Sequence, residues 1–343
     1  MNENLIQAFR ADAEALLSEV TTQPTAEEQQ RQTLLQEYHT RISTASDMMS
    51  RDYAIDDALL SPILPRQGVV ALVGSSDSGK STLLRGLAMA VVRGDEEYIG
   101  FPLSPRTHRA LYISTEDDEA AIARLMRLQV WDSERQNFEG LHFIFDTDNL
   151  LETIELGLQT YAPDVVIVDA FAAPYTGPLN ENNRVRSFLQ LFSQLAVKYH
   201  TLFIFLHHTG KRTESLTPSK HNAIGSQGFE AKMRLMMELR RDPLHPDLRH
   251  LCIVKGNYLT EEYKHDSFVL RFMPDLTFEA TGDRVPFEML KERDVERETE
   301  ESEKLEMIRT LRDEGKTLQE IADMLGYKNA SSIHRILKRE VNS

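Results

Sequence analysis

The chain has 343 residues, of which 41% are hydrophobic and 27% are charged, and its formal net charge is −15. This length fits one large domain or a core with appendages, and the acidic balance means that any contact with DNA must come from local basic patches. A single cysteine, Cys252, excludes an intramolecular disulfide and a cysteine-rich zinc site.

The apolar segments favour a cytoplasmic protein. No basic segment followed by an apolar segment begins the chain, which reads MNENLIQAFRADAEALL, so no secretory signal is expected. The longest apolar runs, such as LFIFL, are too short to span a bilayer. We therefore expect no membrane partner and no structural zinc.

The first predicted region is a helical arm over residues 1–55. Apolar residues recur there at roughly helical spacing: Leu5, Phe9, Leu16, Leu17 and Val20. Pro24 interrupts the pattern, and Thr25 with Glu28 three residues later predicts the start of a second helix. Both an ordinary packing helix and an oligomerisation arm fit this pattern.

The second predicted region, residues 56–285, has an α/β pattern. Five β-rich runs, GVVALVG, RALYIST, LHFIF, VVIVDA and TLFIFLHH, alternate with amphipathic stretches at 81–93, 118–128, 150–161 and 184–199. This alternation predicts a mostly parallel sheet flanked by helices, with strands buried on both faces. Three later runs, RLMMELRR, HLCIVKGNY and SFVLRFMP, are expected to extend the sheet as antiparallel strands.

A P-loop pattern, GSSDSGKS, occupies residues 74–81 between the first strand and the first helix. Glycines allow the backbone N–H groups to turn toward phosphates, Lys80 would reach the β- and γ-phosphates, and the Ser81 hydroxyl would ligate Mg²⁺. We predict nucleotide contacts at Gly74, Ser75, Ser76, Asp77, Ser78, Gly79, Lys80, Ser81 and Thr82. The alternative is a glycine-rich turn without a ligand.

Two carboxylates follow other strands of the predicted sheet. Asp169 ends VVIVD, where a parallel sheet binds ligands, and is predicted to order the Mg²⁺ hydration shell; a turn-capping aspartate is the alternative. Glu116 follows ALYIS and is a candidate to polarise the water that attacks the γ-phosphate. It fits equally well, on local chemistry, as an acid that complements a helix dipole together with Asp117 and Asp118.

Two histidines end the fifth run, and a long polar loop over residues 209–228 follows them. A side chain there, His207 or His208, is placed to sense the γ-phosphate and to relay its loss to the loop. We expect this loop to be mobile and functional.

The ordered set of motifs resembles the RecA-type ATPases, and most closely the RepA-like branch of hexameric replicative helicases of plasmids and other mobile elements. The resemblance rests on YISTEDD, VVIVDA, FLHHTGK, AIGSQGFEAKMR and CIVKGNY together with the P-loop, over about residues 60–275. It implies a RecA-like core, ATP with Mg²⁺, and a ring, expected to be a hexamer, with nucleotide sites between subunits.

Residue roles follow from that resemblance. Glu116 becomes the catalytic base, His208 the sensor in preference to His207, and Arg234 a candidate interface arginine. Lys211 and Arg212 would face DNA in the channel of the ring. Related ring helicases often carry a Lys-x-Arg pair that acts on the neighbouring subunit, but here Lys255 is followed by Asn257. Arg234 or Arg212 then supplies the missing charge, or hydrolysis is slow.

The remaining residues are predicted to form an acidic linker, 286–303, and a helix-turn-helix domain, 304–343. Gly315 ends the first helix, Thr317 and Glu320 form a capping box for the second, and Gly326 makes the turn. The third helix is polar and basic, like a recognition helix. We predict phosphate contacts from Lys338 and Arg339 and base contacts from Ser332 and Arg335; a protein-binding helical bundle is the alternative.

Three functions are consistent with the sequence. The first is a RecA-like DNA-dependent ATPase, a helicase for plasmid or mobile-element replication or mobilisation. The second is a DNA-bound ATPase switch, a regulator or loader that does not translocate, which Asn257 favours. The third is a small-molecule kinase, against which the helix-turn-helix pattern argues.

Overall fold

A computed structural model describes residues 7, 27, 29–31, 42–51, 58–130, 138–175, 177–179, 181–210, 213–224, 226–291, 305–312, 314–327, 329–331 and 333. The chain divides into two units, Met1–Ile55 and Asp56–Ser343. In the first unit, α3 (Ala45–Ser50) begins after Thr44, whose side chain accepts a hydrogen bond from the Asp47 N–H, and none of its residues is buried. The predicted helix start at Thr25 lies outside the described residues.

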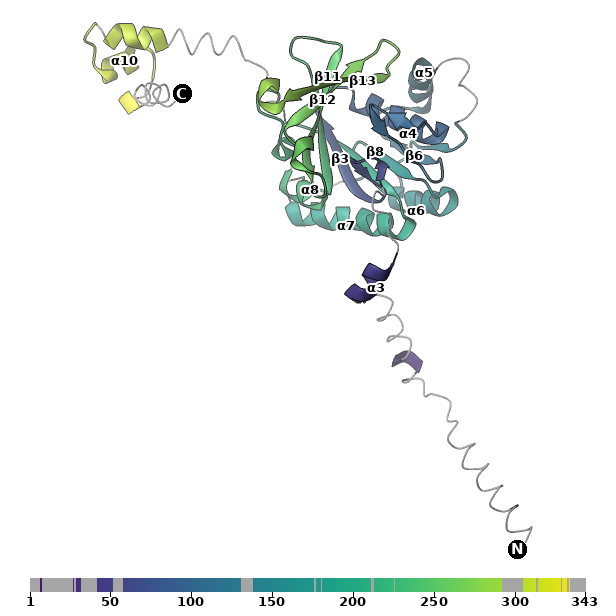
Figure 1. The fold of residues 1–343 in the computed structure, drawn as a ribbon. Coiled ribbons are helices and arrows are strands. Elements are labelled where there is room, and N and C mark those ends of the chain that lie inside the picture. The colour runs from purple at the N-terminus through teal and green to yellow at the C-terminus, as the bar shows by residue number, and fades with distance from the viewer. Residues whose placement is uncertain are drawn as a thin grey trace. The chain divides into compact units, whose positions relative to one another are not determined.

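A nine-stranded sheet forms the centre of the second unit (Figure 1), in the order β13-β12-β11-β10-β3-β9-β8-β6-β7. The parallel strands are β3 (Gly68–Gly74), β6 (Ala110–Ser114), β7 (Leu141–Ile144), β8 (Val165–Asp169), β9 (Leu202–His208) and β10 (Leu235–Arg241). The antiparallel strands are β11 (Leu248–Gly256), β12 (Asp266–Phe272) and β13 (Phe278–Pro286). The predicted α/β class with a mostly parallel, RecA-like sheet is confirmed.

Helices cover both faces of this sheet. They are α4 (Lys80–Arg93), α5 (Glu119–Gln129), α6 (Leu150–Tyr161), α7 (Asn182–Tyr199) and α8 (Ser226–Lys232). Alternate residues of β3 face opposite layers: Leu72 packs in the cluster that contains α4, and Val73 packs in the cluster that contains α6 and α7. This two-sided burial explains the continuous apolar runs of the parallel strands.

The expected direction of one strand was wrong. β10 runs parallel to β3, with Leu235 paired to Val70, whereas β11 and β12 run antiparallel to their neighbours as expected. The short helix α8 returns the chain to the amino end of the sheet before β10 begins, and such a crossover produces a parallel strand. Strand β13 was not predicted, because most of its residues are at least partly exposed and Gly282 interrupts it.

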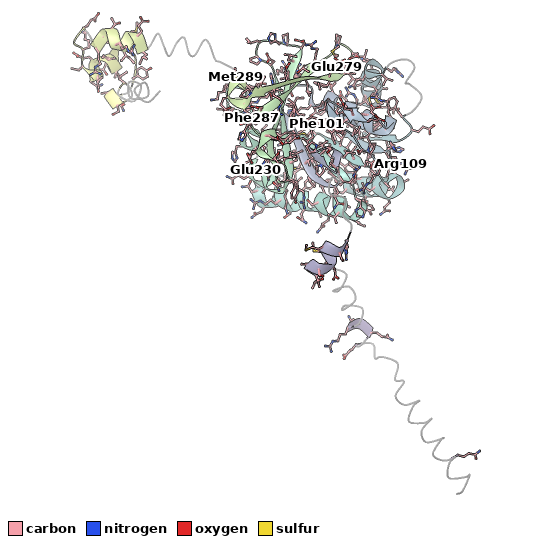
Figure 2. All side chains as sticks on the ribbon, in the orientation of Figure 1. Phe101, Arg109, Glu230, Glu279, Phe287 and Met289 are labelled. Atoms are coloured by element: carbon pink, nitrogen blue, oxygen red, sulfur yellow. The ribbon has the colours of Figure 1, made fainter. Side chains whose placement is uncertain are left out.

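Smaller elements complete the core. Two-stranded sheets join β1 (Ala58–Leu60) to β2 (Leu64–Pro65) and β4 (Glu97–Tyr98) to β5 (Phe101–Pro102), and short 3₁₀ turns occupy Lys220–Asn222, Glu261–Tyr263 and Phe287–Leu290. Figure 2 marks Phe101, whose ring meets the ring of Phe268 edge-on at 4.9 Å. Phe287 and Leu290, which the predicted linker includes, are buried with Cys252. Residues 292–304 lie outside the described residues.

The C-terminal residues contain a small helical cluster. Residues 305–312 are helical, as are 330–331 and 333, and α10 (Leu318–Met324) lies between them in sequence. The predicted capping box is confirmed: Thr317 and Glu320 exchange side-chain and backbone hydrogen bonds at the start of α10. Four residues are buried together: Ile308, Ile321, Ala322 and Ile333. The assignment to the DNA-binding helix-turn-helix class stays a prediction.

In the part of the chain that the structure describes, no helix has both the length and the apolar character needed to cross a membrane.

Candidate nucleotide site

Four strand ends bring the predicted site residues to one edge of the sheet. Gly74 at the end of β3 is paired with His208 at the end of β9, and Ser114 at the end of β6 is paired with Asp169 at the end of β8. Glu116 follows Ser114 by two residues. The carboxyl edge of a parallel sheet is where such folds bind ligands, so the sheet itself assembles this site.

The P-loop, residues 74–81, requires its glycines. A Cβ on Gly74 would lie 2.4 Å from the Leu239 carbonyl oxygen, and Gly79 has a φ of +98°, which favours glycine. Ser78 is buried, and its hydroxyl donates to the Ser75 carbonyl at 3.0 Å. The loop is therefore held in a defined shape between the end of β3 and the start of α4.

Lys80 is only 5% exposed, and its Nζ donates to the Ser75 carbonyl oxygen at 2.5 Å. Burial lowers the pKa of Lys80 from 10.5 to about 8, and the nearby carboxylates of Asp169, Glu116 and Asp77 offset part of that effect. These carboxylates therefore neutralise the ammonium group only in part. A bound polyphosphate would supply the rest of its counter-charge.

We expect ATP affinity to depend on pH through Lys80. Above a pH of about 8 the amine of the nucleotide-free chain is neutral, so binding must first protonate it. ATP affinity should then be constant below this value and fall by about tenfold per pH unit above it. Titrations of ATP against the chain from about pH 7 to about pH 10 would measure this. The Lys80→Arg variant, whose guanidinium stays charged, should lose the dependence; a wild-type affinity that does not change over this range would contradict the assignment.

Ser81, Asp169 and Tyr112 form a small cluster at the start of α4. The Ser81 hydroxyl hydrogen-bonds to Asp169, and the Tyr112 hydroxyl donates to Asp169 Oδ2 at 2.6 Å. Asp169 Oδ1 is buried and has no partner among the described residues. Burial raises the pKa of Asp169, and the hydrogen bonds of Tyr112 and Ser81 oppose that rise. A serine hydroxyl beside an unsatisfied carboxylate oxygen suits Mg²⁺ and its water ligands.

Glu116 and His208 lie next to each other at this edge. Glu116 Oε1 is 3.8 Å from His208 Nε2, and their side chains are 61% and 36% exposed. The helix-capping role belongs to Asp118 instead, whose carboxylate accepts from the Ala121 N–H at 2.8 Å at the start of α5. This leaves Glu116 available for the predicted water-polarising role.

His207 is a core residue. It is buried, its Nε2 lies 2.9 Å from the Ile224 carbonyl oxygen, and its ring contacts those of Phe171 and Phe229. Burial lowers the pKa of His207 to about 4, so it is neutral at ordinary pH. Of the two histidines, His208 is the one whose side chain reaches the predicted site.

The remaining predicted residues divide into three groups. Thr82 lies in the first turn of α4, and its carbonyl oxygen accepts from Gln129 at 3.3 Å. Arg234 is not at this edge: its Cδ is 3.4 Å from where a Cβ on Gly68 would lie, at the amino end of β3. The predicted DNA contacts lie outside the described residues: Lys211, Arg212, Ser332, Arg335, Lys338 and Arg339.

The loop after β9 is anchored more firmly than the sequence suggested. Within it, residues 213–224 contact a buried ion pair on β10 between Glu238 and Arg240. Arg240 donates to the carbonyl oxygens of Thr213 and Leu216 at 2.9 Å and 2.5 Å, and Glu238 accepts from the Ser219 N–H at 3.0 Å. The base of the loop is therefore bound to the strand beside β3.

Sequence reasoning missed two arginines at the P-loop. Arg241 donates to the Asp77 carbonyl oxygen at 2.9 Å, and Arg249 donates to the Ser78 carbonyl oxygen at 2.9 Å. Both come from the hairpin of β10 and β11, more than 160 residues further along the chain. Neither strand carries a sequence motif that would predict a contact with the P-loop.

A family model described as an AAA domain matches residues 36–214, which is more than half of the chain. The chain belongs to this AAA domain family. The match covers the P-loop, Glu116, Asp169 and His208, so this AAA protein is a nucleotide-hydrolysing P-loop ATPase. Arg234, Asn257 and the C-terminal helices lie beyond the matched residues. No curated protein matches this AAA chain.

Proposed function

We propose that this ATPase assembles into a ring, with hydrolysis at subunit interfaces, and acts on DNA as a helicase of the RepA-like kind in plasmid or mobile-element replication or mobilisation. The observation that supports the ring is the position of Arg234. This arginine lies at the amino end of the sheet, whereas the P-loop lies at the carboxyl end. Arg234 therefore serves a nucleotide only when that nucleotide is bound by another subunit.

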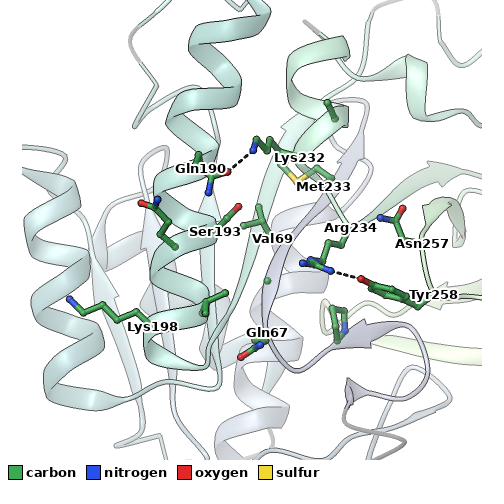
Figure 3. Close-up of a pocket in the computed structure, with 15 residues that line it drawn as sticks. Gln67, Val69, Gln190, Ser193, Lys198, Lys232, Met233, Arg234, Asn257 and Tyr258 are labelled. Carbon is green, nitrogen blue, oxygen red and sulfur yellow. Dashed lines mark hydrogen bonds between the residues drawn. The ribbon is translucent and has the colours of Figure 1, made fainter. Parts of the chain in front are cut away.

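Arg234 lines a cavity of about 840 Å³ between α7, α8 and the ends of β10 and β11 (Figure 3). Its Nη1 donates to the Tyr258 hydroxyl at 2.5 Å, and Lys232 donates to Gln190 Oε1 at 2.5 Å. Neither cation forms an ion pair among the described residues, and none of the described residues that line the cavity is a carboxylate. In a chain of net charge −15, such a cavity is complementary to the phosphates of a neighbouring subunit.

The arginines at the P-loop do not take over this role. The guanidinium groups of Arg241 and Arg249 donate to carbonyl oxygens of the loop itself. Charge that develops on the transferred phosphoryl group needs a donor aimed at that group. We assign this role to Arg234 of a second copy, whose guanidinium group donates to the Tyr258 hydroxyl and to no part of its own P-loop.

The C-terminal helices support DNA as the partner. Three helical segments around a small apolar cluster, with a capping box at Thr317, fit a helix-turn-helix unit. The predicted basic residues of the third helix would give this acidic chain a local patch for phosphates.

We expect DNA affinity to fall as salt rises, with a shallower slope when basic residues of the third helix are removed. Removing one phosphate-binding side chain should reduce the slope of log affinity against log salt by about one unit. Lys338→Ala and Arg339→Ala would be compared with Lys264→Ala, because Lys264 pairs with exposed Glu261 on the surface of the ATPase domain. Slopes that are identical in all three variants and the unmodified chain would argue for a protein-binding bundle instead.

A DNA-bound switch without translocation is the second candidate. Asn257 replaces the arginine that related ring helicases often carry, and its N–H donates to the Arg234 carbonyl at 3.1 Å. A strand-displacement assay separates the two. The motor predicts ATP-dependent displacement that is abolished in Glu116→Gln, while the switch predicts duplex binding without displacement.

A further inference from the structure

The P-loop is held by two arginines that face each other across a hairpin. Arg241 on β10 is directly paired with Arg249 on β11. Arg241 donates through Nε and Nη2 to the Asp77 carbonyl oxygen at 3.2 Å and 2.9 Å, and Arg249 donates through Nε to the Ser78 carbonyl oxygen at 2.9 Å. Each guanidinium group therefore binds one of two consecutive carbonyl groups of the P-loop.

This arrangement is expected to lower the stability of the folded chain. Arg249 is 6% exposed, and burial, followed by the charge of Arg241, lowers its pKa. Its other partners are the carbonyl oxygens of Pro246 and Leu248 and the face of the Phe272 ring at 5.1 Å. Among the described residues Arg249 forms no ion pair. Like charges opposite each other and a buried charge without a carboxylate both destabilise a fold.

The geometry of the peptide group shows what the two contacts achieve. In a trans peptide the carbonyl oxygen of one residue and the N–H of the next point in opposite directions. A donor that fixes the Ser78 carbonyl on one side therefore turns the Gly79 N–H to the other side. No described residue accepts a hydrogen bond from that N–H, and N–H groups of a P-loop bind phosphate oxygens.

We infer that Arg249 is a positioning residue for nucleotide binding, supported by Arg241. It holds the Ser78–Gly79 peptide so that the Gly79 N–H faces the phosphates before they arrive. A bound polyphosphate would add counter-charge beside the two guanidinium groups; among the described residues Arg241 has the Asp77 carboxylate at 3.7 Å, and Arg249 has none within ion-pair distance. This role goes beyond the proposed function, since it depends neither on DNA nor on a second subunit.

The test compares ATP and ADP affinity in Arg249→Met and Arg249→Lys. Loss of a charge-assisted hydrogen bond that orients the loop should raise the Kd of both nucleotides by about tenfold or more in the methionine variant. The lysine variant, which keeps a donor and the charge, should recover part of this affinity. Arg271→Met is the matched control, because Arg271 lies on β12 and contacts exposed Asp247 at 3.8 Å; its Kd should equal that of the unmodified chain.

A purely structural arginine would give a different pattern. Arg249→Met would then lower Tm and leave both Kd values within about twofold of the unmodified chain, which would overturn the inference. If Arg249→Met fails to fold, Arg241→Met gives the same test on the Asp77 carbonyl, because the Arg241 side chain is 48% exposed and its removal leaves no buried gap. An unchanged Kd in folded Arg241→Met would likewise overturn the inference. DNA binding and ring assembly are measured separately, so failure here leaves the proposed function untouched.

Discussion

Glu116→Gln is expected to bind ATP as tightly as the unmodified chain and to hydrolyse it about 10²- to 10⁴-fold more slowly. The amide keeps the size and the hydrogen-bonding reach of the carboxylate but does not accept a proton from the attacking water. Glu116 lies 3.8 Å from His208 at the carboxyl edge of the sheet, where the P-loop also lies. Unlike Asp118, it caps no helix among the described residues. Its removal should therefore affect turnover and leave the fold intact.

Steady-state hydrolysis and ATP titration on the same preparation would measure both quantities. Glu119→Gln is the matched control, since Glu119 is an exposed acid in the first turn of α5. Hydrolysis at the unmodified rate in Glu116→Gln would show that the glutamate is only one of the acids near the helix terminus. A parallel loss of ATP binding would point to a role in holding the nucleotide.

Arg234→Ala is expected to lower kcat by about a thousandfold while ATP binding is preserved. In the proposed ring the arginine would contribute charge to a neighbour's transition state, and it touches no part of its own P-loop. Arg184→Ala is a suitable control, because Arg184 forms an exposed ion pair with Glu181 at the start of α7.

Mixing variants gives the sharper form of this prediction. In rings assembled from equal amounts of Arg234→Ala and Lys80→Ala, some interfaces combine an intact P-loop with an intact Arg234. Random assembly makes about a quarter of the interfaces complete, so hydrolysis should rise well above the sum of the two variants measured alone. A mixture that stays inactive, under conditions where mixed rings form, would exclude action between subunits.

Much of the ATPase core could be predicted because its signals are local. The run that ends at Gly74 is continuously apolar because β3 is buried on both faces, and the P-loop motif fixes where the following helix begins. Asp169 and His208 end similar strands, so the parallel pairing of those strands was enough to bring them together. The same reasoning identifies the edge of the sheet on which the nucleotide binds.

Other features depend on contacts between distant residues. From local sequence, Glu116 fitted both a catalytic role and a helix-dipole role, and the hydrogen bond from Ala121 shows that Asp118 is the residue that caps the helix. The direction of β10 depended on the crossover through α8. Arg249 sits in a strand with no motif, and its role follows only from the 2.9 Å contact with Ser78.

The most direct test of the whole account is the rate of ATP hydrolysis by the full chain with and without single-stranded DNA, in the presence of Mg²⁺. Hydrolysis is expected to rise when single-stranded DNA is added and to disappear in Lys80→Ala, which lacks the buried ammonium group at the centre of the site. Hydrolysis at the same rate with and without DNA would contradict the assignment to a DNA motor, and hydrolysis that survives in Lys80→Ala would contradict the site itself.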